Sequence, residues 1–166
     1  MKTVKCFEYV TKDELLLALS KKGNFYYLLG EDSINKQKFY LIPLWISIGV
    51  ITDWHGVRPM CIEIEKGALI GYNFYVDMID TDNRVNRIVQ TTSVFFEFVF
   101  CEMQNVTIAV FETSVFGISA GGKLLWESDF DDIITGYEIV EGLLKISKYE
   151  GESAFIAICN GEIKQF

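Results

Sequence analysis

Residues 137–166 read YEIVEGLLKISKYEGESAFIAICNGEIKQF, and turn-forming residues interrupt this stretch at Glu141-Gly142, Gly151 and Asn160-Gly161. The segments between them are rich in aliphatic and aromatic residues. Asn-Gly is the preferred pair for a two-residue type I′ turn, because both central residues of that turn need a positive φ. Short turns can join only antiparallel neighbours. The stretch therefore predicts an antiparallel meander.

The preceding segment, Val115–Glu127, predicts one more hairpin, with Gly121-Gly122 as its turn. It resembles one strand pair of a quinoprotein-type propeller blade, in which a glycine turn precedes a tryptophan that packs between blades. Trp126 takes the place of that tryptophan. The resemblance is confined to this segment and occurs once, whereas a propeller needs several copies. We therefore interpret it as a local hairpin.

Upstream segments also favour strands. Met60–Glu65 alternates between two faces, and Val94–Cys101 places Val94, Phe96, Phe98 and Phe100 on one face, opposite Glu97. Further strands are expected at Phe25–Leu29, Tyr40–Ile51, Ala68–Val76 and Val106–Phe111.

One helix is expected near the N-terminus. Thr11 is a capping residue, Glu14 follows three residues later, and Gly23 ends the helix after two lysines. The sequence thus predicts a mainly β fold bordering on α+β: an antiparallel sandwich, or a partly open barrel or meander, with one N-terminal amphipathic helix. We expect a single domain over residues 1–166. The polar interval Asp80–Ser93, a loop or a short helix, is the candidate sub-boundary.

Composition narrows the class of protein. Half of the 166 residues are hydrophobic, which is enough to build a core. The longest apolar run, Phe39–Ile51, is too short to span a bilayer and contains Pro43. No apolar stretch of signal-peptide length follows Lys2 and Lys5, so we expect no signal peptide. We therefore expect a cytoplasmic protein without a membrane partner. The four cysteines form no C-x-x-C pair, so we expect reduced thiols and neither a metal nor a cofactor.

Charge is distributed unevenly. Residues 1–90 carry 11 basic and 11 acidic side chains, whereas residues 91–166 carry four basic and 12 acidic ones, which accounts for the net charge of −8. A field of one sign repels nucleic acid and speeds encounter with a basic partner. The alternative is that the acidic surface only keeps the protein soluble.

Two motifs match catalytic patterns in part. Gly117–Gly121 fits G-x-S-x-G, but that chemistry needs a histidine later in the chain, and the single histidine is His55. Gly117–Lys123 fits the start of a P-loop, but Leu124 stands where the motif requires Ser or Thr for magnesium. Neither constellation is complete, so we lean towards a protein that is not an enzyme.

The favoured function is a non-enzymatic binding protein, of the immunity or adaptor type, whose acidic C-terminal half docks a basic partner protein. Aromatic residues beside acidic ones are typical of interfaces. The predicted partner-binding residues are Trp126, Glu127, Asp129, Phe130, Asp131 and Asp132. The alternative for the aspartates is that Asp129–Thr135 forms one helical turn with an acidic start.

Two further functions stay open. A small-ligand site or enzyme could use the loop residues Asp53, Trp54, His55 and Arg58, with Glu63 and Glu65 nearby in sequence. A homo-oligomerising module could instead use the apolar segment Phe39–Ile51 as its seam.

Overall fold

A computed structural model describes residues 2–23, 25–33, 36–53 and 57–164. The chain is mostly β-strand in antiparallel sheets, with one helix near the N-terminus, and its described strands close no barrel. The fold class predicted from the sequence is therefore confirmed.

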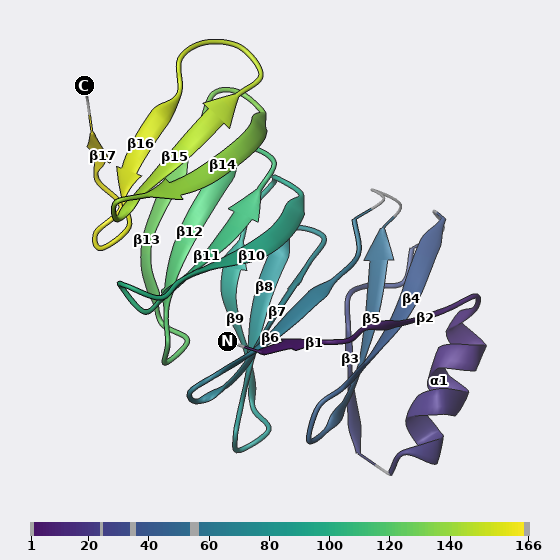
Figure 1. Ribbon diagram of the computed structural model, residues 1–166. Helices are drawn as coiled ribbons and strands as arrows, with labels where there is room; N and C mark the ends of the chain where they lie inside the picture. Colours follow the sequence, from purple (N-terminus) through teal and green to yellow (C-terminus); the bar gives the residue numbers. More distant parts are fainter. Residues whose placement is uncertain (1, 24, 34–35, 54–56, 165–166) are drawn as a thin grey trace.

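The strands form four sheets, which we number in the order in which they stack (Figure 1). The first sheet contains, in spatial order, β2 (Phe7–Tyr9), β4 (Gln37–Pro43), β5 (Ser47–Asp53) and β3 (Tyr26–Leu29). The second contains β1 (Lys2–Val4), β6 (Met60–Ile64), β7 (Gly67–Tyr72), β8 (Tyr75–Asp80) and β9 (Val85–Gln90). The third contains β10 (Phe95–Cys101), β11 (Val106–Phe111), β12 (Ser114–Ser119) and β13 (Leu124–Asp129). The fourth contains β14 (Ile134–Val140), β15 (Leu143–Lys148), β16 (Ala154–Ala157) and β17 (Ile163–Lys164).

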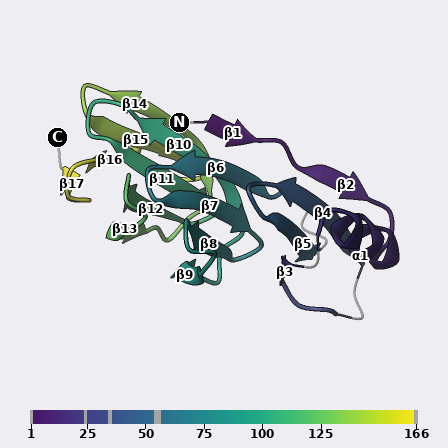
Figure 2. The same cartoon turned by 90° about the horizontal axis from the view of Figure 1, so that it is seen from below.

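Neighbouring sheets pack face to face around three apolar cores. Ile48 and Val50 of the first sheet meet Ile70 of the second, and Leu69 of the second meets Phe111 of the third. Ile108 of the third sheet lies in one core with residues of the fourth. The second and third sheets are therefore covered on both faces, which explains why their strands β7 and β11 are buried along their whole length. Figure 2 shows the same stack from below.

The helix α1 (Lys12–Lys21) covers the outer face of the first sheet, where Leu15 and Leu19 pack on Leu41. The Thr11 hydroxyl accepts a hydrogen bond from the Glu14 amide at 3.2 Å, which confirms the predicted cap. The Glu14 carboxylate accepts from the amide of Val10, one residue before the cap.

The hairpins of the C-terminal third are confirmed. Glu141 and Gly142 both have positive φ and join β14 to β15 as a two-residue turn. The type I′ turn predicted at Asn160-Gly161 is wrong, because only Gly161 has a positive φ and Ala157 pairs with Glu162 across four residues. The longer loop keeps Ile158 in the core of the third and fourth sheets.

Three other expectations are corrected. A bulge between Phe95 and Glu97 puts Phe95 and Phe98 on one face of β10 and Phe96 on the other. The interval Asp80–Ser93 is neither a plain loop nor a helix, because it contains β9, the edge strand of the second sheet. The segment Asp129–Thr135 ends β13 and begins β14 and forms no helical turn.

Candidate functional site

Three connections of the third and fourth sheets meet at one edge of the stack. The amide of Ile134 donates to the carbonyl of Glu112 at 2.7 Å, and the amide of Tyr149 donates to the carbonyl of Ile133 at 2.8 Å. These backbone bonds bring the β11–β12, β13–β14 and β15–β16 connections together. We call their carboxylates the acidic end: Glu112, Asp129, Asp131, Asp132, Glu150 and Glu152.

The carboxylates of the acidic end have different roles. Asp132 links two of the connections, because its oxygens accept hydrogen bonds from the amides of Ile133 and Glu150. Asp131 lies 3.7 Å from the ammonium of Lys148, but its side chain is 92% exposed. Such an exposed pair is weak and leaves the carboxylate accessible. Three more carboxylates of the acidic end are exposed: Asp129, Glu150 and Glu152.

The two aromatic residues predicted to bind a partner, Trp126 and Phe130, are mostly covered by the protein core. Trp126 is only 7% exposed, and its indole nitrogen donates to the carbonyl of Ile158 at 2.7 Å. Phe130 is half-buried against the core of the third and fourth sheets, whereas Glu127 is exposed on the edge strand β13. Sequence reasoning missed two exposed apolar side chains in the same connections, Ile133 (44% exposed) and Tyr149 (72% exposed).

The alternative ligand site is described only in part, because Trp54 and His55 lie outside the described residues. Arg58 forms an ion pair with Glu8 at 2.8 Å, and this hydrogen bond lowers the pKa of the Glu8 carboxyl. The backbone amide of Asp53 donates to the Asn73 side chain at 2.9 Å.

The two glutamates near that loop also have partners distant in sequence. Glu63 pairs with Lys2 at 3.3 Å, and Glu65 accepts a hydrogen bond from Asn105 at 3.5 Å. In the ranges that the structure describes, no three His, Cys, Asp or Glu side chains are placed to hold a metal ion.

The segment proposed as an oligomer seam, Phe39–Ile51, lies inside the molecule for most of its length. Leu41 packs under α1, and Tyr40, Ile42, Ile48 and Val50 face the second sheet. These side chains are therefore already covered by other parts of the same chain, and the seam expected there has no exposed strand face.

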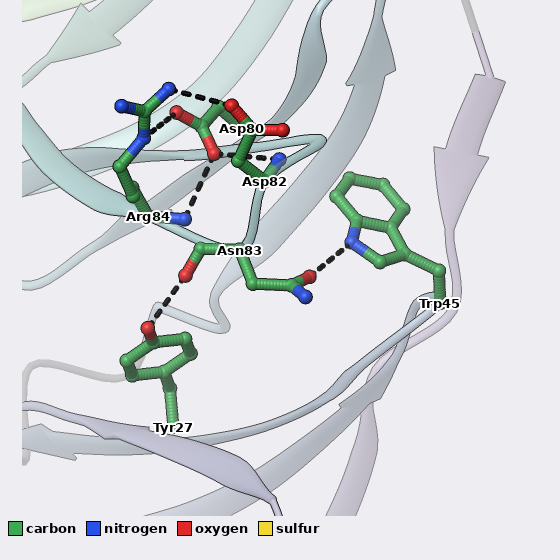
Figure 3. Close-up of polar contacts among 6 residues, drawn as sticks. All are labelled: Tyr27, Trp45, Asp80, Asp82, Asn83 and Arg84. Atoms are coloured by element: carbon green, nitrogen blue, oxygen red, sulfur yellow. Dashed lines mark hydrogen bonds and ion pairs between the residues drawn. The ribbon is translucent and has the colours of Figure 1, made fainter.

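A hollow that the sequence did not predict opens where the first and second sheets meet. Trp45, in the turn between β4 and β5, donates from its indole nitrogen to Oδ1 of Asn83 at 2.8 Å (Figure 3). The Tyr27 hydroxyl donates to the Asn83 carbonyl at 2.5 Å. The hollow beside Trp45 has a volume of about 470 Å³. Its lining residues are Lys22, Phe25, Pro43, Leu44, Trp45, Ile46, Ser47 and Asn83.

The turn that carries Asn83 is rigidly held. Asp80 accepts hydrogen bonds from the amides of Asp82 and Arg84 at 2.9 and 2.8 Å, and from the Arg84 guanidinium at 2.9 Å (Figure 3). The Arg84 amide is the main cause of a lowered Asp80 pKa. Asn83 has φ +63°, a conformation that asparagine tolerates better than most residues.

A second hollow, of about 550 Å³, lies between the edge strands β3 and β9. Its polar groups satisfy one another: buried Asp77 accepts from Arg87 at 2.8 Å and from the Tyr72 hydroxyl at 2.6 Å. Arg87 also lies over the Tyr75 ring, 3.8 Å from its centre. These contacts link β7, β8 and β9 of the second sheet to one another. The polar groups are therefore engaged with each other and not free to bind a ligand.

Comparisons with protein-family models and with curated protein sequences returned no match. Within the described part of the chain, no helix has both the length and the apolar character needed to cross a bilayer.

Proposed function

We propose that this chain is a non-enzymatic, cytoplasmic binding protein that docks a basic partner protein through its acidic end. The observation that carries the proposal is the clustering of six carboxylates by backbone hydrogen bonds between three separate connections. Lys148 is the one lysine paired with this cluster in the described residues. The local field is thus negative and accelerates encounter with a positively charged surface.

Exposed apolar side chains at the acidic end supply the contact energy that exposed charges lack. Tyr149 and Ile133 project from the same connections as Asp131 and Glu150. At many interfaces a few aromatic anchors dominate binding, and a polar rim surrounds them. We therefore replace Trp126 by Tyr149 as the expected anchor, and we keep Phe130 as its support.

An NMR titration tests the proposal. The ¹⁵N-labelled protein is titrated with the basic peptide Ac-KKWKK-NH₂ and with its acidic counterpart Ac-EEWEE-NH₂. The proposal predicts that the basic peptide shifts amide signals of residues 129–133 and 149–153, and that added salt weakens this binding. Shifts confined to the opposite turns, at residues 102–105, 121–123 and 141–142, would contradict it. Equal shifts with both peptides would contradict it too.

A further inference from the structure

Trp45 is an exposed aromatic side chain that is held in place. Its side chain is half exposed (49%), yet its indole nitrogen is bonded to Asn83, and Asn83 is fixed in turn by Tyr27 and by its own tight turn. A side chain that is already ordered loses little conformational entropy when a partner binds. Tryptophan is also one of the residue types enriched among the residues that dominate binding.

The hollow beside Trp45 offers both apolar and polar contacts. Phe25 is 61% exposed and packs edge-to-face against Tyr27, with ring centres 5.4 Å apart. Ser47 and Asn83 add polar groups to the lining. A volume of about 470 Å³ lies within the range of pockets that accept a large side chain or a small ligand.

The charge of the hollow favours an anion. Lys22, which caps the C-terminal end of α1, is the one charged residue among its described lining residues. Two carboxylates of the turn that carries Asn83, Asp80 and Asp82, are not among the lining residues, and both are paired with Arg84 at 2.9 and 2.7 Å. The Arg84 guanidinium offsets one of these two negative charges, whereas Lys22 lies in the lining itself and can pair with a bound carboxylate.

We propose that this hollow is a second binding site, which takes an acidic segment of a partner protein carrying a large apolar side chain. The apolar side chain packs against Trp45 and Phe25, and an adjacent carboxylate pairs with Lys22. The occupant is opposite in charge to the partner expected at the acidic end. The two sites therefore select different partners. Failure of one of the two proposals would leave the other standing.

Short peptides test the proposal on the full-length protein. The probes are Ac-EEFEE-NH₂, its alanine version Ac-EEAEE-NH₂ and the basic peptide Ac-KKFKK-NH₂, and the readout is the indole N–H signal of Trp45. We expect Ac-EEFEE-NH₂ to shift this signal in a saturable way. We expect both other peptides to bind more weakly by about fivefold or more, since one lacks the apolar group and the other has the wrong charge.

Two lysine-to-glutamate variants distinguish binding at this hollow from a general effect of the protein's net charge. Lys22→Glu should weaken binding of Ac-EEFEE-NH₂ by about fivefold or more, whereas Lys123→Glu, the same change on an exposed turn of the third sheet, should have little effect. Both positions are exposed, so both variants are expected to fold. Equal weakening by the two variants, or tighter binding of Ac-KKFKK-NH₂, would overturn the proposal. If maltohexaose shifts the indole N–H signal of Trp45 and none of the peptides does, the proposal is also overturned. The hollow would then be a carbohydrate-binding site.

Discussion

The indole nitrogen of Trp45 lies 2.8 Å from Oδ1 of Asn83, and this bond joins the β4–β5 turn of the first sheet to the β8–β9 turn of the second. The two residues are 38 positions apart in the sequence. The contact therefore contributes both to the stability of the stack and to the orientation of an exposed aromatic ring.

Replacement of Asn83 should separate the effect of losing this hydrogen bond from the effect of backbone strain at position 83. Asn83→Ala removes the bond to Trp45 and places an alanine at φ +63°, so we expect a loss of about 1–3 kcal/mol in the free energy of unfolding. Asn83→Gly removes the same bond without the strain and should cost about 1 kcal/mol less. Urea unfolding of the three proteins measures the order. Equal stability of the two variants would show that backbone strain plays no part at this turn.

The ion pair between buried Asp77 and exposed Arg87 should be sensitive to removal of the arginine. Asp77 is 1% exposed, and Arg87→Ala leaves the Asp77 carboxylate with one hydrogen bond from a described side chain, that of the Tyr72 hydroxyl. We expect a loss of about 2–4 kcal/mol, part of which returns when Asp77→Asn is added, because the double variant no longer buries an unpaired charge. A thermodynamic cycle by urea unfolding tests this. Strict additivity of the two single variants would contradict the pairing.

Gly117 should not tolerate a side chain. A Cβ at this position would lie 2.1 Å from the Trp126 ring, so Gly117→Ala forces the indole out of its packed position. We expect a loss of about 2–3 kcal/mol in the free energy of unfolding. Gly121→Ala is the matched control, because its nearest neighbouring atom would be 3.8 Å away. Similar stability of the two variants would show that Trp126 can move aside freely.

The cysteines should differ in reactivity in an order set by exposure and pKa. Cys159 is exposed and should react first with a thiol reagent at pH 8, while buried Cys61 and Cys101 should react only on unfolding. Burial raises the pKa of Cys6 to about 11, so this half-buried thiol should be slow at pH 8 and should speed up as the pH approaches 11. Mass spectrometry after timed labelling gives the order. Faster labelling of Cys6 than of Cys159 at pH 8 would contradict it.

The sequence predicted those elements whose signals are local. The capping pair of Thr11 and Glu14 located α1, and the Gly-containing turns located the hairpins of the third and fourth sheets. Turn and cap preferences depend on only a few neighbouring residues, so they can be read without knowledge of the tertiary structure. The edge strand β9 was not predicted, because its sequence is polar. One side of an edge strand has no neighbouring strand, so polar residues are tolerated there.

The candidate sites were harder to predict because they depend on contacts between distant residues. The aspartates at 129, 131 and 132 were identified by their spacing, but the adjacent Glu150 and exposed Tyr149 enter only through the backbone bond to Ile133. The burial of Trp126 also depends on distant residues, since Gly117 and Gly161 make room for its ring inside the stack. The Trp45 hollow is lined by residues from three segments that are separate in sequence: Lys22 and Phe25, residues 43–47, and Asn83. A local sequence pattern cannot predict that such segments lie together.

Affinity capture from the native host tests the central claim about the acidic end most directly. Two fourfold variants carry the same net charge: Asp129→Asn, Asp131→Asn, Glu150→Gln and Glu152→Gln remove charge from the acidic end, whereas Glu102→Gln, Glu138→Gln, Glu141→Gln and Glu162→Gln remove it elsewhere. All eight carboxylates are exposed. We predict a stoichiometric basic partner that is retained by the wild type and by the second variant but lost from the first. Equal loss from both variants, or no basic partner on the wild type, would contradict the account.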